Sequence, residues 1–129
     1  MPYSVLIFGI RKAGLSPEEF KDYYENKHIP LLKSLLGDQF AKSHTRYYIT
    51  SGAIAQPAFI MGQPSDLPWD VVAALNFADE EHLKRCAAIY EDEETQKIFA
   101  ADEENFLDRA SLKMVILGDV RQSVNEALQ

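Results

Sequence analysis

The order of apolar and polar residues along the chain predicts alternating strands and helices. Short segments rich in β-branched and aromatic residues are typical of strands, and longer segments with apolar residues three or four positions apart are typical of helices. The predicted strands are Tyr3–Lys12, Phe40–Thr50, Trp69–Phe77 and Leu112–Leu117. The predicted helices are Pro17–Leu36, interrupted near its middle, Asp79–Tyr90 and Glu93–Asn105.

This order of elements is strand, helix, strand, strand, helix, strand. It predicts an α+β fold, a ferredoxin-like βαββαβ sandwich with an antiparallel sheet. We expect residues 1–120 to form one domain, and residues 121–129 to form a C-terminal tail that is a short helix or a frayed end.

The first helix has a clear start and a predicted interruption. Ser16 is suited to the N-cap, Pro17 to the first helical position and Glu19 to the third, where its carboxylate meets free amides. Pro30 disfavours helical geometry in the residue before it, so we expect a kink around Lys27 to Ile29. The inward-facing stripe before the kink consists of Phe20, Tyr23, Tyr24, the stem of Lys27 and His28.

Three of the strands are apolar on both faces. Val5–Phe8, Val71–Leu75 and Met114–Leu117 lack the alternation of a strand with one solvated face. The helices of this fold cover one face of the sheet. We therefore expect a second copy of the chain to cover the other, giving a homodimer joined through the sheet faces.

The connection between the second and third strands is unusually long. Residues 51–68 contain several glycines and prolines, yet also Ile54, Phe59, Ile60 and Met61. Long connections in small domains are often functional. Two interpretations remain open, an Ω-loop packed on its own side chains and a lid that closes over a pocket.

Composition narrows the range of partners. The 129 residues are 47% apolar, enough for a core without disulfides, and the formal net charge is -7. This charge repels nucleic acid and anionic membranes, so we expect neither as a partner. The single cysteine, Cys86, is expected to be a buried thiol, and no targeting or membrane-spanning signal is evident. The expected location is cytoplasmic.

His28 and Asp70 are the best candidates for chemistry. His28 is in phase with Phe20 and Tyr24 and therefore points inward, either as an acid–base group or as a histidine that closes hydrogen bonds at a helix end. Asp70 starts an apolar strand, where a carboxylate needs a partner, or else lies in a turn just outside the sheet.

Other polar groups carry weaker signals. His44 alternates with polar neighbours, which favours a solvent-facing strand position, and His82 lies on a charged helix face. The acidic residues of segments 91–94 and 102–104 lack histidines at ligand spacing, so we interpret them as a solvated helix face rather than a metal site. With no metal, phosphate-loop or nucleophile motif, we predict acid–base chemistry on an organic molecule without a cofactor.

Several of these residues form a recognisable pattern. The run Arg11–Phe20, Tyr24 and His28-Ile29-Pro30 resembles the start of the EthD domain family. The later residues that agree with this family are Trp69-Asp70, Phe77, Asp79, Asp102, Phe106 and Asp108. The resemblance implies a dimeric α+β barrel in which each subunit holds a cavity between sheet and helices.

The resemblance also suggests a function. The family is similar to cofactor-free enzymes of aromatic polyketide metabolism, including fungal anthrone decarboxylases, dehydratases and cyclases. Residue by residue, it implies that His28 is the acid–base group and Asp70 its catalytic partner, whereas Ala74 stands where we associate the family with a second carboxylate. The expected substrate-binding residues are Tyr24, His44, Tyr47, Trp69, Phe77 and Phe106.

We therefore expect a cofactor-free lyase or cyclase of secondary metabolism that decarboxylates, dehydrates or closes a ring of a small aromatic, polyketide-type substrate. Alternatives on the same fold are a cofactor-free quinone-forming monooxygenase, a non-catalytic aromatic-ligand-binding or stress protein, and a haem-binding protein. Fold does not choose among them.

Overall fold

The computed structural model describes residues 3–50, 54 and 56–128. In this part of the chain the strands form one antiparallel sheet of four strands in the order β2-β3-β1-β4. The strands are β1 (Tyr3–Gly9), β2 (Ser43–Tyr48), β3 (Val71–Phe77) and β4 (Lys113–Ile116). The predicted ferredoxin-like α+β fold is thus confirmed.

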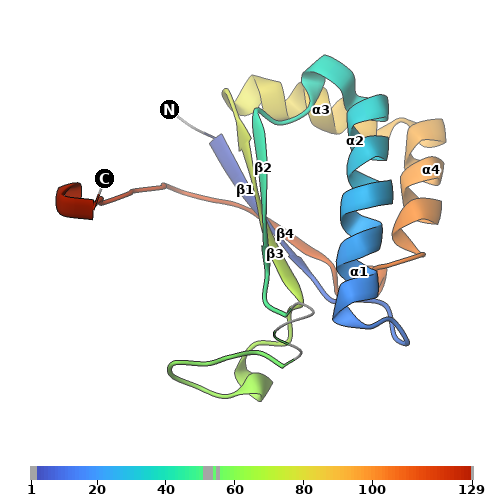
Figure 1. Ribbon diagram of the computed structural model, residues 1–129. Coiled ribbons are helices and arrows are strands. Elements are labelled where there is room, and N and C mark those ends of the chain that lie inside the picture. The colour runs from blue at the N-terminus through green and yellow to red at the C-terminus, as the bar shows by residue number, and fades with distance from the viewer. Residues whose placement is uncertain (1–2, 51–53, 55, 129) are drawn as a thin grey trace.

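The helices pack together against one face of this sheet (Figure 1). They are α1 (Pro17–Tyr23), α2 (Ile29–Leu36), α3 (Glu80–Glu91) and α4 (Glu93–Glu103). A π-helical turn, Tyr24–His28, joins α1 to α2, and short 3-10 turns lie at Gly37–Gln39, Pro64–Asp66, Arg109–Ser111 and Glu126–Leu128. No helix in the described ranges is long and apolar enough to cross a membrane.

The first helical segment starts as predicted but continues past the expected kink. The Ser16 hydroxyl accepts from the Glu19 amide, and the Glu19 carboxylate accepts from the Ser16 amide, a complete capping box. Near Pro30 the chain widens into the π turn, in which the Ile29 amide donates to the Tyr24 carbonyl five residues earlier. The wider turn accommodates the proline without breaking the helix.

The core lies between the helices and the sheet. Along β3, Val71, Ala73, Leu75 and Phe77 are buried on the helical side. Phe20, Phe99 and Phe106 are the large aromatic side chains buried between them and the helices. Cys86 is a buried free thiol, as expected, and burial raises its pKa.

The opposite sheet face, which we call the open face, is also apolar. The strand register places Leu6 opposite Ala74 and Val115, and Phe8 opposite Val72. In the described part of the chain no helix covers this face (Figure 1). The sequence prediction of strands that are apolar on both sides is therefore correct, and the single chain buries one of those sides.

The described residues of the long connection do not lie over the core, as a lid would. The described residues of segment 51–68, namely 54 and 56–68, project beyond the open face, away from the helices (Figure 1). A lid over the cavity lined by His28 would have to lie on the helical side of the sheet. The tail after β4 also extends outward, and it ends in a 3-10 turn rather than a regular helix.

We expect the capping box to contribute measurably to stability. Ser16→Ala removes the hydroxyl that accepts from the Glu19 amide and should lower the free energy of unfolding by about 1 kcal/mol in urea titrations. Ser34→Ala, at an exposed interior position of α2, is the control and should leave stability unchanged or slightly raised. Equal effects of the two substitutions would contradict a capping role.

Candidate active site

A cavity of about 320 Å³ lies between the helices and the sheet. Its sheet side consists of apolar residues, including Val5, Ile7, Leu75 and Phe77. Most of the helical side is apolar as well, and the polar lining residues gather in two clusters. Lysine and arginine are absent from the lining within the described residues. A bound carboxylate or phosphate would therefore lack a counter-ion.

The first cluster contains His28, which pairs with Asp102, a residue outside the lining. The His28 Nδ1 lies 2.5 Å from the Asp102 Oδ2, and both side chains are more than nine-tenths buried. The other carboxylate oxygen accepts from the Tyr23 hydroxyl at 2.8 Å, and that hydroxyl accepts from the Asn105 amide. With Nδ1–H donating to the carboxylate, the His28 Nε2 is left to accept a proton, and the described residues offer it no partner.

The local backbone explains why His28 points into the cavity. Tyr24 and His28 are four residues apart in the π turn and both are buried. The fully buried ring of Phe106 packs against both, with its centre 5.3 Å from the centre of the Tyr24 ring and 4.9 Å from the centre of the His28 ring. The two side chains are thus fixed between α4 and the sheet.

Tyr24 and His44 provide a second polar pair. The Tyr24 hydroxyl lies 3.3 Å from the His44 Nε2, and the buried His44 Nδ1 has no hydrogen-bond partner among the described residues. Burial lowers the pKa of His44 to about 4, and the positive charges of Arg46 and protonated His28 act in the same direction. Burial raises the pKa of Tyr24. Both groups are therefore uncharged near neutral pH.

An ion pair between Arg46 and Glu25 lies beside His44. The Arg46 guanidinium donates to both oxygens of the Glu25 carboxylate at 2.6 and 2.9 Å, and the Tyr48 hydroxyl donates to the same carboxylate. Although burial alone would raise the pKa of Glu25, these donors lower it. Arg46 also donates to the backbone carbonyl of His44 within β2. Its bonds to Glu25 tie strand β2 to the π turn.

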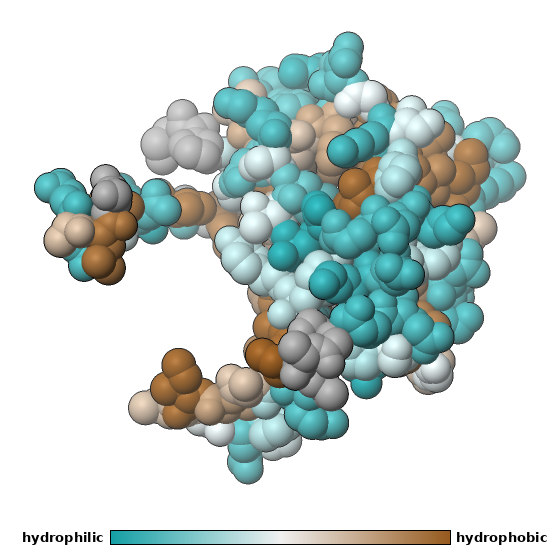
Figure 2. Space-filling view, viewed as in Figure 1, coloured by the Kyte–Doolittle hydropathy of each residue, from teal (hydrophilic) through white to brown (hydrophobic). Residues whose placement is uncertain are grey.

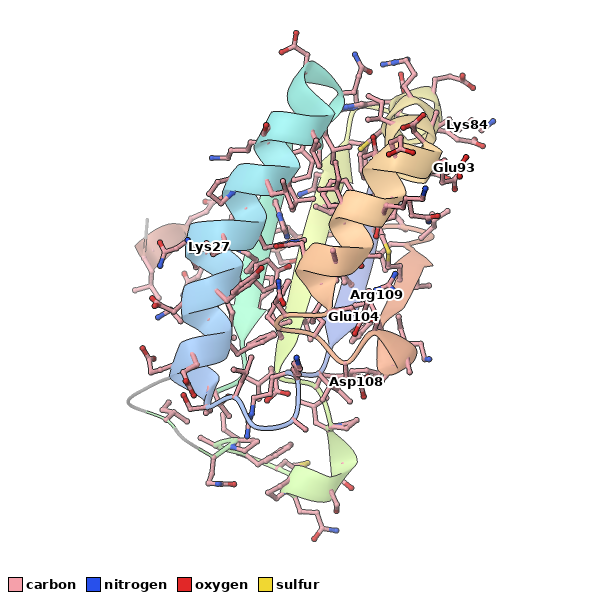
Figure 3. The ribbon with its side chains drawn as sticks, turned by 90° about the vertical axis from the view of Figure 1, so that its right-hand side faces the viewer. Lys27, Lys84, Glu93, Glu104, Asp108 and Arg109 are labelled. Carbon is pink, nitrogen blue, oxygen red and sulfur yellow. The ribbon has the colours of Figure 1, made fainter. Side chains whose placement is uncertain are left out.

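The second cluster of the lining is centred on Glu103. Its buried carboxylate accepts from the Tyr90 hydroxyl at 3.0 Å and from the Arg109 guanidinium at 3.1 Å. Burial, followed by the nearby negative charge of Glu103, raises the pKa of Tyr90. Figure 3 shows Arg109 close to Glu104 at the end of α4, whereas Lys27, Lys84 and Glu93 lie on the outer side of the helices.

A family model described as the EthD domain matches residues 12–110, most of the chain. The chain belongs to the EthD family. Among curated proteins none matches it.

Solved structures agree with this EthD assignment at the level of the fold. An ethyl tert-butyl ether d family protein from Bacillus halodurans is 17% identical, with a TM-score of 0.60, over 93% of this chain and 100% of that one. An EthD-like protein from Ralstonia eutropha is 16% identical, with a TM-score of 0.55, and the match covers 90% of this chain and 87% of that one. A protein from Arabidopsis thaliana is 13% identical, with a TM-score of 0.60, and the match covers 95% of this chain and 99% of that one.

The structure brings several of the residues predicted from the sequence together. In this EthD domain Tyr24, His28, His44 and Phe77 line the cavity. Phe106 does not line it but lies in direct contact with the His28 ring. The interpretation of His44 as solvent-facing is wrong, because its position in β2 puts it on the helical side, opposite Leu75.

Three predicted site residues lie elsewhere. Asp70 precedes β3 and accepts from the Arg11 guanidinium at 2.7 Å and from the Arg11 amide at 2.8 Å, so its carboxylate is already satisfied away from the cavity. Trp69 packs against Phe8 at 5.4 Å between ring centres, and Tyr47 is 58% exposed on the open face. None of the three is among the cavity-lining residues.

Sequence reasoning missed the two carboxylates of the site. Asp102 and Glu103 were expected on a solvated face, but they are 9% and 5% exposed. Phe99, Asp102, Glu103 and Phe106 are three or four residues apart and share the buried side of the α4 segment. That spacing was available in the sequence and is the signal that could have identified them.

His82 was also assigned to a charged surface, yet it is buried and bonded to backbone groups of residues 39, 40 and 78.

The lowered pKa of His44 predicts a pH-dependent contribution to stability. The unfolded chain takes up a proton here near pH 6.5 and the folded chain only near pH 4, so stability is lost as pH falls through this window. His44→Gln should abolish that component. From pH 7.5 to pH 4.5, the wild type should lose about 2 kcal/mol more of its free energy of unfolding than the variant.

Urea titrations of both proteins at a series of pH values measure this difference directly. Other acidic groups titrate equally in the two proteins and cancel in the comparison. Stability curves that stay parallel between pH 7.5 and pH 4.5 would contradict a neutral, buried His44.

Proposed function

We propose that this EthD domain is a cofactor-free lyase or cyclase in which His28 transfers a proton to or from an aromatic, polyketide-type substrate. The observation that carries the proposal is His28 on the wall of an apolar cavity, bonded at Nδ1 to the buried carboxylate of Asp102 outside the lining. A histidine held by a carboxylate at Nδ1 has its tautomer fixed. Its Nε2 then accepts a proton, and the carboxylate stabilises the imidazolium that forms.

The proposed step is enolisation of the bound substrate. His28 Nε2 removes a proton from a carbon next to a carbonyl group, and the electron pair moves onto the carbonyl oxygen. The neutral Tyr24–His44 pair lies in the same wall and is suited to hydrogen bonding with that oxygen. In dehydration, the imidazolium returns its proton to the departing hydroxyl, which leaves as water. In ring closure, the enolate carbon attacks a second carbonyl, whose oxygen takes the proton.

The charge of the lining favours some of these reactions over others. The described lining contains Glu103 and Glu91 but no cation, so it suits a neutral substrate better than a carboxylate. Dehydration and ring closure start from neutral molecules, whereas decarboxylation starts from an acid. We therefore favour the first two.

Substitution of His28 tests this proposal. With a panel of neutral β-polyketone-derived aromatics, turnover is followed by NMR for water loss or ring closure. His28→Ala should lower kcat by about 10² or more with a smaller change in KM, because a general acid–base group acts mainly in the transition state. Lys27→Ala, at the exposed neighbouring position, is the control and should retain activity.

Three further results would redirect the assignment. A folded His28→Ala protein with activity within a fewfold of wild type would contradict the role of His28. Oxygen uptake during turnover would identify a monooxygenase. Saturable binding of the same aromatics without any turnover would identify a ligand-binding protein.

Asp102→Asn should also lower kcat, because Asp102 bonds to His28. Asp70→Asn should have a smaller effect on kcat, because Asp70 pairs with Arg11.

We further propose that the protein is a homodimer joined through the open faces. The supporting observation is the apolar surface formed by Leu6, Phe8, Val72, Ala74 and Val115, which the helices leave uncovered.

The dimer should be seen in sedimentation at micromolar concentration. Ala74→Arg adds a charge near the middle of the open face and should shift the protein to monomer, because two such charges would face each other. Ala101→Arg, on an exposed position of α4, should remain dimeric. A wild-type protein that sediments as a monomer would contradict this proposal.

A further inference from the structure

The second polar cluster of the cavity lining takes no part in the proton transfer proposed for His28. Hydrophilic side chains cover much of the outer surface of the helices (Figure 2), but Glu103 is 5% exposed and lines the cavity together with Tyr90. A carboxylate in such a position costs free energy unless donors compensate it. The nature of those donors decides whether Glu103 can also bind a ligand.

The described residues supply two donors to the Glu103 carboxylate. The Tyr90 hydroxyl donates to Oε2 at 3.0 Å, and the Arg109 guanidinium donates to Oε1 at 3.1 Å. Tyr90 lines the cavity, whereas Arg109 does not. The charge of the carboxylate is therefore balanced from outside the cavity. Because the two oxygens of a carboxylate together accept about four hydrogen bonds, acceptor capacity remains for a donor on a bound molecule.

The cluster is held in place by the surrounding structure. The Tyr90 ring stacks on the fully buried ring of Phe99, with 4.8 Å between the ring centres. At the end of α4, the Glu103 carbonyl accepts from the Leu107 amide at 2.8 Å and from the Phe106 amide at 3.1 Å. An acceptor fixed in this way loses little conformational entropy when a ligand binds, so the cluster is preorganised.

We propose that Glu103 is a specificity-determining residue of the cavity, whose carboxylate accepts a hydrogen bond from a phenolic hydroxyl of the bound aromatic. This inference rests on the proposed function and narrows its substrate class. The substrate is then a neutral aromatic with a free ring hydroxyl in addition to the carbonyl group on which His28 acts. We call the Glu103 carboxylate with its two donors the hydroxyl subsite.

The surroundings of the carboxylate favour a neutral hydroxyl over other ligand groups. A carboxylate only accepts hydrogen bonds, so it gives nothing to an ether, a carbonyl group or an anion. An ammonium group can donate to it, but Arg109 already supplies the positive charge. Burial, followed by the charge of Glu103, raises the pKa of Tyr90, so its hydroxyl stays protonated near neutral pH and adds no negative charge that would attract a cation.

The same segment of α4 positions both polar parts of the cavity. Asp102 bonds to the His28 ring, and the next residue, Glu103, lines the cavity. Consecutive residues of a helix point about 100° apart, so the two carboxylates reach different neighbours. The hydroxyl acceptor and the proton-transfer group are thus fixed relative to each other, and an aromatic that engages both must carry its hydroxyl and its carbonyl group in a matching arrangement.

Binding of matched aromatics to the full chain tests the subsite without requiring turnover. The probes are naphthols and their methyl ethers, which share the ring system but differ in the hydroxyl proton. In calorimetry at neutral pH, the wild type should bind the naphthol at least tenfold more tightly than its ether, because a hydrogen bond to a charged acceptor contributes about that much. Glu103→Gln, which preserves the shape of the side chain, should reduce this preference to less than threefold.

The neighbouring residue offers a matched control. Glu104→Gln is the same substitution one position later, at a side chain that is 67% exposed, contacts the same Arg109 and lies outside the lining. It should keep the full preference for the naphthol. Equal binding of naphthol and ether by the wild type would overturn the subsite, and so would a Glu103→Gln protein that keeps the preference.

A second variant separates ligand binding from a purely structural ion pair, and it applies even where Glu103→Gln does not fold. Arg109→Gln breaks the ion pair from outside the lining but leaves the carboxylate, so the naphthol preference should remain. Loss of the preference in this variant would overturn the subsite. A cationic probe, naphthylmethylammonium, should bind the wild type no more tightly than the naphthol. Tighter binding of the cation would overturn the assignment to a hydroxyl.

The outcomes also separate the subsite from the proposed enzyme. His28→Ala should keep the naphthol preference, since the two groups act on different parts of the ligand. A naphthol preference without turnover of any substrate would retain the subsite and contradict the enzyme. Turnover that depends on His28, combined with equal binding of naphthol and ether, would retain the enzyme and overturn the subsite. Failure of every naphthol to bind saturably would also overturn it.

Discussion

The buried carboxylate of Asp102 is the constraint around which the site is organised. A charge removed from water must be compensated, and Asp102 is compensated by two donors from the first helical segment, Tyr23 and His28. These two bonds join α4 to the end of α1 and to the π turn. The helices that cover the sheet and the histidine that faces the cavity are therefore fixed by the same group, so changes in helix packing and changes in the site are coupled.

Local patterns in the sequence are sufficient to predict most of the fold. The capping box at Ser16, the alternation of strands and helices, and strands that are apolar on both faces were all readable, because each depends on neighbouring residues. The choice between an Ω-loop and a lid for the long connection could not be made from the sequence, since composition indicates that a segment is unusual but not on which side of a sheet it emerges.

The site could be predicted only in part for the same reason. His28 was found because it lies in phase with Phe20 and Tyr24 on one helix. Its carboxylate partner is 74 residues away, within a strongly acidic segment that resembles a solvated surface. Asp70 was a reasonable candidate because a carboxylate beside an apolar strand needs a partner, but its partner is Arg11, 59 residues away. Pairings across such separations are set by tertiary packing and leave little trace in local sequence.

The π turn has a consequence for how this chain can change over time. Each residue of a regular helix rotates the next side chain by about 100°. Loss of one residue within Tyr24–His28 would restore regular helical hydrogen bonding while turning all preceding side chains by that angle relative to α2. The surrounding sheet and helices would still form, but the histidine or the tyrosine would leave the cavity wall. A single-codon deletion at this turn is therefore a short evolutionary route from a pocket lined by both His28 and Tyr24 to one that lacks one of them, on the same scaffold.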